Sequence, residues 1–350
     1  MATPELKVLF AHHRWWYPAA TSGADVANHE LARALKRRGA TVCVLGSAPP
    51  GADKRIRDRT YDADGVSVLL VSSDFHRRLR AALSDRRPHV LVTSYPDPDC
   101  TAEDLERMVA ATSRAGVPLV VYVHQLDESC SRYEPIKDAL AAVVTNSRFM
   151  AERVGATWGK PVEVVYPVPD HRGVKAGACD GPFITFFNPT PAKGLSVAHN
   201  LAASRMQGRP FLFVEGFIDT ETHGISLVRS GNLVHARKSP DVATIYGMTR
   251  TLIVPSQWEE PFGRVALEAM YNRIPVIASR TGGLVESVGD GGVLVNDYSS
   301  VEAWAEAICA LDDQKVRKRV IDAGTAHVEK FSLDAEVEKL EGILRNAAGI

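Results

Sequence analysis

Cysteine is scarce in this 350-residue chain, and its few thiols are scattered: Cys43, Cys100, Cys130, Cys179 and Cys309. No C-x-x-C pair occurs, so neither a disulfide framework nor a thiolate metal site is indicated. Long apolar runs are also missing, because none approaches the ~18 residues needed to cross a bilayer, and the N-terminus lacks the pattern of a signal peptide. We therefore expect a cytoplasmic protein with reduced thiols.

The glycine motifs that bind phosphates in many nucleotide-binding proteins are absent too. Neither G-x-G-x-x-G nor G-x-x-x-x-G-K-[ST] occurs, and there is no internal repeat or low-complexity tract. A classical dinucleotide-binding or P-loop function therefore has no motif to support it. The composition, 45% hydrophobic and 24% charged residues, is that of an ordinary globular protein. Its length exceeds what one typical core uses, so two domains are expected.

The formal net charge of −1 argues against bulk binding of nucleic acid. Basic residues nevertheless gather in the first quarter of the chain: Lys36, Arg37, Arg38, Lys54, Arg55, Arg57, Arg59, Arg77, Arg78, Arg80, Arg86 and Arg87. Residues 75–87 predict a helix with Phe75, Leu79, Ala82 and Leu83 on one face, beside a basic face. That basic face is either simply solvated, which is the commoner case, or makes weak contact with an anionic surface such as lipid or a charged acceptor.

Strand and helix patterns alternate along the chain, as in open parallel α/β sheets. In residues 1–168 we expect strands at 6–10, 41–45, 66–71, 90–93, 118–123 and 142–145, and helices at 24–38, 75–84, 102–115 and 136–141. A stretch rich in proline, glycine and aspartate, 169–182, predicts a linker. A second α/β series in residues 183–332 has expected strands at 183–187, 211–214, 233–235, 252–254, 276–279 and 293–295, and a last helix spans 333–346.

The most informative stretch is 251–270. It predicts a buried strand at 251–254, then a turn, then a helix that opens at Pro261, a residue whose fixed φ suits a first helical position. Glu260 and Glu268 bracket this junction, and the backbone of Phe262 and Gly263 lies at the positive end of the helix dipole. Such a site can hold an anion on its amides and a hydroxyl-rich sugar on its carboxylates. A plain amphipathic helix with two solvated glutamates is the alternative.

The run Ser256-x-x-Glu-Glu-Pro-Phe-Gly, with seven residues between Glu260 and Glu268, resembles the E-x7-E signature of the family-4 retaining glycosyltransferases. The resemblance implies the GT-B fold, in which two Rossmann-like, doubly wound α/β domains face a central cleft. Residues 1–168 would then bind the acceptor and residues 183–332 the nucleotide-sugar donor. The C-terminal helix, within 333–350, would cross back to the first domain.

The same resemblance assigns contacts to the donor. Glu268 would hold the ribose hydroxyls and Glu260 the sugar hydroxyls, while the amides of Phe262 and Gly263 lie near the sugar or the phosphates. Lys193 stands beside a glycine in a turn between a strand and a helix, where an ammonium is well placed to stabilise a departing diphosphate. An exposed lysine in a proline-rich turn is the alternative.

Two positions depart from the family pattern. The usual arginine of the diphosphate clamp is replaced by Asn188, so Arg264 or Arg14 would take its place, or Lys193 and backbone amides would suffice. The glycine pair before the first helix is reduced to Gly23, preceded by serine, although one glycine still allows a close approach to the donor's phosphates. A further turn, 281–286, resembles the family's Gly-Gly-Leu-x-Glu loop, and ordinary turn chemistry explains its glycines equally well.

His124 is expected at the carboxyl edge of a parallel strand, where ligands bind in open α/β sheets. It resembles the family's active-site histidine, so His124, Lys193 and Glu260 are the implied catalytic residues; a histidine that merely caps the strand is the alternative. The acceptor is expected to meet the loop 12–23 and its neighbourhood, through the following side chains: Arg14, Trp15, Trp16, Tyr17 and Asp127.

A metal is not expected. Asp97-Pro98-Asp99 has the D-x-D form that holds Mn²⁺ or Mg²⁺ in the other large glycosyltransferase fold, but the prolines at 96 and 98 favour a rigid surface turn. Helix termini and a lysine can take the diphosphate charge instead, so the implied enzyme is metal-independent and has no cofactor.

The implied reaction transfers a sugar, with retention, from a nucleotide diphosphate sugar, with UDP-sugar preferred to GDP-sugar. The acceptor stays open: a small molecule, glycan, lipid, protein or nucleic acid. Three alternatives also remain open. They are a GT-B nucleotide-sugar epimerase, a glycosyltransferase that grips nucleic acid through its basic first quarter, and a noncatalytic protein that only binds sugar nucleotides.

Overall fold

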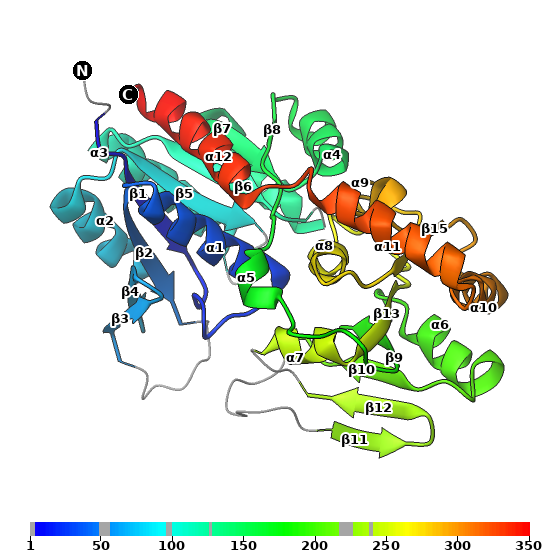
Figure 1. The fold of residues 1–350 in the computed structure, drawn as a ribbon. Coiled ribbons are helices and arrows are strands. Elements are labelled where there is room, and N and C mark those ends of the chain that lie inside the picture. The colour runs from blue at the N-terminus through cyan, green and yellow to red at the C-terminus, as the bar shows by residue number, and fades with distance from the viewer. Residues whose placement is uncertain (1–3, 49–56, 96–99, 126–127, 217–226, 238–240) are drawn as a thin grey trace. The chain divides into compact units, whose positions relative to one another are not determined.

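The computed structural model describes residues 4–48, 57–95, 100–125, 128–216, 227–237 and 241–350 (Figure 1). The chain divides into two compact units. The first unit combines Met1–Pro167 with Leu333–Ile350, and the second is Val168–Ser332. Each unit is a sheet covered by helices on both faces, so the predicted α/β class with two Rossmann-like domains is confirmed.

In the described part of the first unit, the strands follow the order β3-β4-β2-β1-β5-β6-β7-β8. Neighbouring strands are parallel, apart from β3, which pairs antiparallel with β4. Every strand predicted in this unit is present, while the short edge strands β3 and β8 were not predicted. The bounds are β1 (Lys7–His12), β2 (Thr41–Ser47), β3 (Arg59–Ala63), β4 (Val66–Val71), β5 (Val90–Tyr95), β6 (Leu119–Val123), β7 (Leu140–Thr145) and β8 (Glu163–Val164).

The helices of the first unit are α1 (Gly23–Arg37), α2 (Phe75–Arg86), α3 (Ala102–Ala115), η1 (Glu128–Ala139), α4 (Arg148–Trp158) and α12 (Leu333–Ala348). Capping boxes start α1 and α3, in which Ser22 pairs with Asp25 and Thr101 with Asp104. The α-helix expected at 136–141 is wrong. Pro135 lies inside a 3₁₀ segment there, and the following strand begins earlier than predicted, at Leu140.

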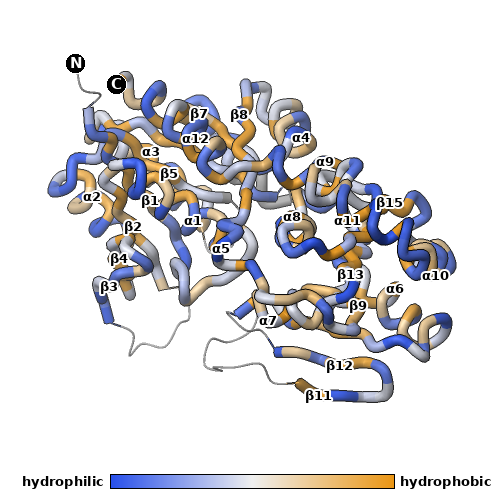
Figure 2. Tube along the Cα trace, in the orientation of Figure 1, coloured by the Kyte–Doolittle hydropathy of each residue, from blue (hydrophilic) through white to orange (hydrophobic). Residues whose placement is uncertain are grey.

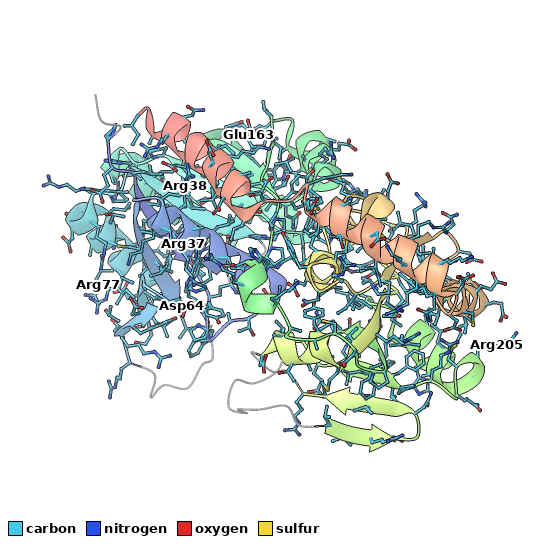
Figure 3. All side chains as sticks on the ribbon, in the orientation of Figure 1. Arg37, Arg38, Asp64, Arg77, Glu163 and Arg205 are labelled. Atoms are coloured by element: carbon cyan, nitrogen blue, oxygen red, sulfur yellow. The ribbon has the colours of Figure 1, made fainter. Side chains whose placement is uncertain are left out.

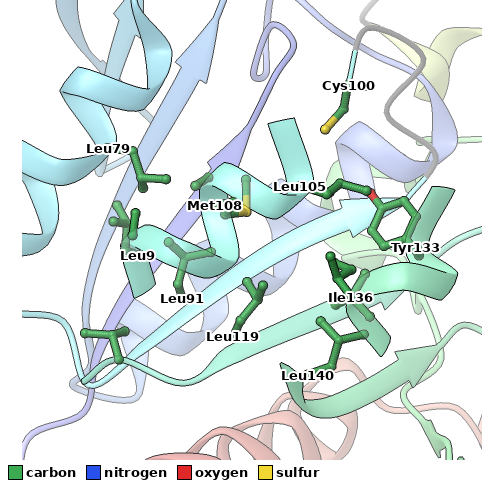
Figure 4. Packing of buried hydrophobic residues seen from close by; sticks show 14 of the residues in the cluster. Leu9, Leu79, Leu91, Cys100, Leu105, Met108, Leu119, Tyr133, Ile136 and Leu140 are labelled. Atoms are coloured by element: carbon green, nitrogen blue, oxygen red, sulfur yellow. The ribbon is translucent and has the colours of Figure 1, made fainter. Parts of the chain in front are cut away.

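The core of the first unit lies on both faces of its sheet, because side chains alternate along each strand. On one face Leu9 and Leu91 pack with Leu79 of α2 and Met108 of α3 (Figure 4). On the other, α1 and α12 pack together over a second cluster: Val8, Phe10, Leu31, Leu35, Val337, Leu340 and Leu344. Figure 2 shows the hydrophobic residues concentrated along these central strands.

In the described part of the second unit, the strand order is β11-β12-β10-β9-β13-β14-β15, and β11 pairs antiparallel with β12. The six predicted strands are present, and the exposed edge strand β11 was not predicted. The bounds are β9 (Phe183–Phe187), β10 (Phe211–Val214), β11 (Leu227–Ser230), β12 (Leu233–Ala236), β13 (Thr249–Val254), β14 (Val276–Ser279) and β15 (Val293–Val295).

The helical segments of the second unit are α5 (His171–Val174), α6 (Leu195–Asn200), η2 (Leu201–Arg205), α7 (Val242–Gly247), α8 (Arg264–Tyr271), α9 (Leu284–Val288), η3 (Gly289–Gly291), α10 (Val301–Ala310) and α11 (Gln314–Val328). The segment 169–182, expected as a linker, lies within this unit and includes α5. Asn272 fastens it to the end of α8, since the amide of Asn272 accepts from Ala176 N at 2.8 Å and donates to Val174 O at 2.8 Å.

No helix in the described ranges is both long enough and apolar enough for a bilayer crossing. Among the described cysteines, Cys43, Cys100, Cys179 and Cys309 carry free thiols.

A half-buried carboxylate on α12 yields the first testable prediction. Glu336 accepts a hydrogen bond from Tyr166 N at 2.8 Å, and burial raises the pKa of its carboxyl group. A carboxyl whose folded-state pKa is raised favours folding below its unfolded pKa and loses that contribution as the pH rises through the folded pKa. Glu336→Gln keeps the acceptor oxygen without the charge, so it is expected to be more stable than the parent at pH 8.

Urea unfolding at a series of pH values checks this expectation. The difference in free energy of unfolding between variant and parent should grow from pH 4 to pH 8, by no more than about 1.4 kcal/mol per pH unit for one proton. Glu338→Gln is the control, because it removes the same charge from an exposed position of the same helix. Equal pH profiles for the two variants would contradict the prediction.

Candidate functional site

The turn after β13 holds Glu260 in a dense set of hydrogen-bond donors. Its carboxylate accepts from Lys193 Nζ at 2.6 Å, from Ser256 Oγ at 3.0 Å and from Trp258 Nε1 at 3.0 Å. Glu260 is 7% exposed, and the Lys193 ammonium also lies 5.2 Å from the centre of the Trp258 ring. The structure therefore brings together Lys193 and Glu260, which are 67 residues apart in sequence, as a partly buried ion pair.

Glycines shape the same turn. Gly263 has φ of 92° and precedes the first residue of α8, so the helix opens at Arg264 and the predicted opening at Pro261 is wrong. The left-handed backbone at Gly263 ends the turn, and a helix cannot continue back through it. Gly283 N donates to Glu260 O at 2.6 Å, and a Cβ on Gly283 would lie 2.1 Å from Pro261 O. The glycine turn at 281–286 thus packs closely against the backbone at Glu260 and Pro261 and holds that backbone in place.

The loop after β9 explains the asparagine that replaces the family's usual arginine. Asn188 has φ of 59°, a left-handed conformation in which asparagine is strongly enriched. Its carboxamide occupies the space where a side chain on Gly216 would lie, because a Cβ built there falls 1.1 Å from Asn188 Oδ1. Asn188 therefore packs against the end of β10. Gly194 closes the loop against Pro255 O, 1.9 Å from its hypothetical Cβ.

Glu268 lies on α8 in a second polar group. Tyr246 OH, from α7, donates to Glu268 Oε2 at 2.7 Å, and Arg264 Nε lies 3.7 Å from Glu268 Oε1. Burial, reinforced by the charge of Glu268, raises the pKa of Tyr246 well above its usual value, so the phenol stays protonated and donates. Arg264 thus neighbours the carboxylate, whereas Phe262 is buried, with its carbonyl accepting from Ser287 Oγ at 2.6 Å.

In the first unit, His124 follows β6 at the carboxyl edge of the sheet, as predicted. Its Nε2 lies 3.0 Å from Asn28 Oδ1, and the Asn28 amide nitrogen donates to Ser94 Oγ at 2.9 Å. The backbone carbonyl of His124 accepts from Asn146 Nδ2 at 2.7 Å. With the Asn28 amide oriented in this way, His124 carries its proton on Nε2. The histidine is therefore positioned by side chains from α1, β5 and the loop after β7.

The loop 12–23 contains both buried and partly exposed side chains. Trp16 is 3% exposed and belongs to the core, whereas Trp15 and Tyr17 are partly exposed, and the Tyr17 ring stacks on His29 at 4.3 Å. Trp16 was predicted to face the acceptor, but the structure places its ring among the core residues. Burial lowers the pKa of neighbouring His12 to about 3, with Arg14 contributing.

Arg14 is held in place by the start of α1. Its Nη2 lies 3.0 Å from Asp25 Oδ2, and the same carboxylate accepts from Ser22 N at 2.9 Å, next to Gly23, the first residue of the helix. Arg14 thus joins the capping box of α1. Asp127 lies outside the described residues, as do Asp97 and Asp99 of the D-x-D sequence.

The basic first quarter is partly neutralised. Ion pairs join Arg77 to Asp74 and Arg78 to Asp58 near α2, and Arg38 to Glu341 on α12; Arg38 and Arg77 are labelled in Figure 3. The apolar side chains of α2 are buried in the core, so that face of the predicted amphipathic helix packs against the sheet.

A group of side chains in the described part of the chain has the composition of a cation site. The ligand atoms of His13, His76 and Asp104 lie within 4.8 Å of one another. His76 Nε2 is 2.9 Å from Asp104 Oδ1, while the other Asp104 oxygen accepts from Thr101 at the start of α3. An ordinary hydrogen bond accounts for the His76–Asp104 contact.

Sequence reasoning missed the partners of the predicted residues. Ser256 and Trp258 stand just before the E-x7-E stretch, and their donor groups were the available signal. The other partners come from distant segments of the chain: Tyr246, Asn28 and Ser94. For Asn28, the only signal in the sequence was a polar residue on the otherwise apolar face of the predicted first helix.

Comparison with known proteins matches two stretches of the chain to family descriptions. Residues 21–171 match "Glycosyltransferase Family 4", and residues 230–327 match "Glycosyl transferases group 1". The chain is 36% identical over 142 residues to D-inositol 3-phosphate glycosyltransferase of Corynebacterium diphtheriae, a stretch that covers 38% of this chain and 33% of the relative. It is 36% identical over 73 residues to spore coat protein SA of Bacillus subtilis, covering 20% of this chain and 19% of that protein. The chain thus spans about a third or less of the length of these curated relatives.

Solved structures share the whole fold. A glycosyltransferase from Rickettsia africae superposes with a TM-score of 0.73 at 16% identity, covering 99% of both chains. Anabaena Alr3699/HepE in complex with UDP and glucose superposes with a TM-score of 0.74 at 15% identity, covering 97% of this chain and 99% of that one. At such identities the likeness shows the fold.

Proposed function

Because this chain belongs to glycosyltransferase family 4, we propose that it transfers a sugar from a nucleotide diphosphate sugar to an acceptor. The observation that carries the proposal is the Lys193–Glu260 pair at the carboxyl edge of the second sheet, with Glu268 on the helix that follows. Carboxylates accept hydrogen bonds from sugar hydroxyls, and an ammonium stabilises phosphate oxygens.

In this proposal the second unit binds the donor. Glu268 accepts from the ribose hydroxyls, and Tyr246 holds its carboxylate in place. Glu260 accepts from the hydroxyls of the transferred sugar, and Lys193, which pairs with Glu260 in the structure, turns to the diphosphate. UDP-sugar is the favoured donor, a preference supported by the UDP complexes of Anabaena Alr3699/HepE, a protein of the same fold.

The proposed reaction retains the configuration at the anomeric carbon. The bond from that carbon to the diphosphate oxygen breaks while the acceptor oxygen bonds on the same face, and the acceptor's proton passes to the departing phosphate oxygen. Lys193 stabilises the charge that develops on the diphosphate, so the reaction needs no metal or other cofactor. His124, whose ring is positioned by Asn28, contacts the transferred sugar or orders the acceptor.

A thermal-shift screen against UDP-, GDP- and ADP-sugars tests donor binding. A ligand at 100 times its Kd raises the free energy of unfolding by about 2.7 kcal/mol, so a true donor gives a clear shift. His124→Ala is expected to keep the donor-induced shift and to lose most of the transfer, measured as nucleotide released in the presence of acceptor. A screen without any nucleotide-sugar shift would overturn the proposal.

The same assay separates the alternatives. An epimerase converts the sugar nucleotide without any acceptor, and a noncatalytic binding protein shows the shift without turnover. A nucleic-acid acceptor would bind with a steep salt dependence. D-inositol 3-phosphate, which appears in the name of the Corynebacterium diphtheriae relative, belongs in the acceptor panel as one phosphorylated small molecule among others.

A further inference from the structure

A cavity of about 190 Å³ opens at the amino edge of the sheet in the second unit. Pro182 and Pro210, just before β9 and β10, line it, together with Arg250 of β13 and with residues near α10 and α11. Lys193 and Glu260 follow the opposite ends of β9 and β13. The cavity is therefore separate from the proposed donor site, because the strands of a parallel sheet all begin at one edge and end at the other.

The cavity carries an excess of positive charge. Among the described residues that line it, Arg209, Arg250 and Arg317 face a single acidic residue, Asp312, a formal excess of two positive charges. Asp312 already forms an ion pair with Arg209. Both of its oxygens accept from the Arg209 guanidinium, one of them at 3.0 Å from Nη1. The charges of Arg250 and Arg317 also act on Asp312, but the hydrogen bonds that its carboxylate accepts in the described structure come from Arg209.

The guanidinium group of Arg317 uses only part of its hydrogen-bond donors in the described structure. Its Nη2 donates to the backbone carbonyl of Arg250 at 2.7 Å, while its Nη1 is buried without a hydrogen-bond partner among the described residues. Burial and the nearby charge of Arg250 lower the pKa of Arg317. An anion in the cavity would offset the repulsion between the two guanidinium groups.

We propose that this cavity binds a phosphate group, either as inorganic phosphate or as a small phosphate monoester, on Arg250 and Arg317. The planar guanidinium fork matches phosphate oxygens, and a monoester carries about −1.5 to −2 charges at pH 7, which balances the excess of the lining. The cavity is smaller than the roughly 300–1,000 Å³ of pockets for drug-sized ligands, which sets a limit on the organic part. Ile184, Ile308 and Leu311 offer that part an apolar wall.

Calorimetric titration of the full chain with inorganic phosphate, at constant ionic strength, tests the site, and glycerol 3-phosphate is the second probe. Both are expected to bind at one site per chain. Tighter binding of glycerol 3-phosphate than of phosphate identifies an ester site, and the reverse order identifies a site for the free ion. Arg250→Gln and Arg317→Gln should each raise the Kd for both probes at least tenfold, whereas Arg229→Gln, at an exposed position on β11, should leave it unchanged.

Two further variants keep the result interpretable. Lys193→Gln is expected to retain phosphate binding, because Lys193 lies at the other edge of the sheet. Arg250→Gln leaves the Arg250 carbonyl in place as the acceptor for Arg317, so it carries the test if Arg317→Gln misfolds. The proposal is overturned if wild-type protein binds neither probe at millimolar concentration, if Arg250→Gln binds as wild type, or if Lys193→Gln alone abolishes binding.

Discussion

Replacing Lys193 with alanine is expected to lower kcat for sugar transfer by about 10²- to 10³-fold, equivalent to roughly 2.7–4 kcal/mol, as for other preorganised groups that stabilise charge in a transition state. The interaction of the ammonium with the diphosphate strengthens as the bond to the sugar breaks and further charge develops, so the loss should fall on kcat more than on donor affinity. Steady-state kinetics with the donor found in the thermal-shift screen measure both quantities.

Lys193 also pairs with Glu260, so the loss of charge stabilisation at the diphosphate must be separated from the loss of support for the Glu260 carboxylate. Ser256 and Trp258 still donate to the Glu260 carboxylate in the alanine variant, so the carboxylate keeps part of its support. Lys193→Arg retains the charge and should recover part of the rate. Lys318→Ala, at an exposed position in the same unit, is the matched control. Equal rates for Lys193→Ala and Lys318→Ala would rule out the proposed role.

Glu268→Ala is expected to reduce donor affinity by at least about 10²-fold. Hydrogen bonds to a charged group contribute about 1.5–3 kcal/mol each, and a carboxylate that accepts from two ribose hydroxyls loses both. The Kd for UDP, measured by calorimetric titration, isolates this effect, because UDP carries the ribose without the transferred sugar.

Controls separate donor recognition from stability. Removing the Glu268 carboxylate leaves the buried Tyr246 hydroxyl without its acceptor, at a cost of about 1–3 kcal/mol in folding. Thermal unfolding without ligand must therefore be recorded for each variant. Glu302→Ala removes an exposed carboxylate of the same unit and should leave the affinity unchanged. A Glu268→Ala protein that is folded and binds UDP as wild type would show that the ribose is held elsewhere.

The central strands could be predicted because their sequences are continuous apolar runs, as expected for strands buried on both faces of a parallel sheet. β6, with five consecutive buried residues, is an example. The edge strands β3 and β11 could not be predicted, because their residues are largely polar or exposed. Each of them pairs, in antiparallel orientation, with a single neighbouring strand. Their place in the sheet depends on that neighbour more than on their own sequence.

The contacts around Glu260 and Glu268 could likewise be predicted only in part. The spacing of Glu260 and Glu268 pointed to a site, but not to the pairing of Glu260 with Lys193 or of Glu268 with Tyr246, since both contacts join separate loops and helices. For Trp16, by contrast, the sequence suggested a contact that the structure does not support. An aromatic residue in a loop suggested ligand contact, whereas its neighbours Phe10 and His12 enclose it in the core.

The contact between the 281–286 turn and the backbone at Glu260 and Pro261 constrains attempts to engineer donor choice. A methyl group at either Gly282 or Gly283 would overlap main-chain atoms, at 2.5 Å from Glu260 O and 2.1 Å from Pro261 O respectively. Mutant libraries that randomise these two codons would therefore consist mostly of chains with a displaced carboxylate. Diversity introduced at Gln257, whose side chain is partly exposed, changes no residue of this contact, whereas Trp258 donates to the Glu260 carboxylate and should be kept.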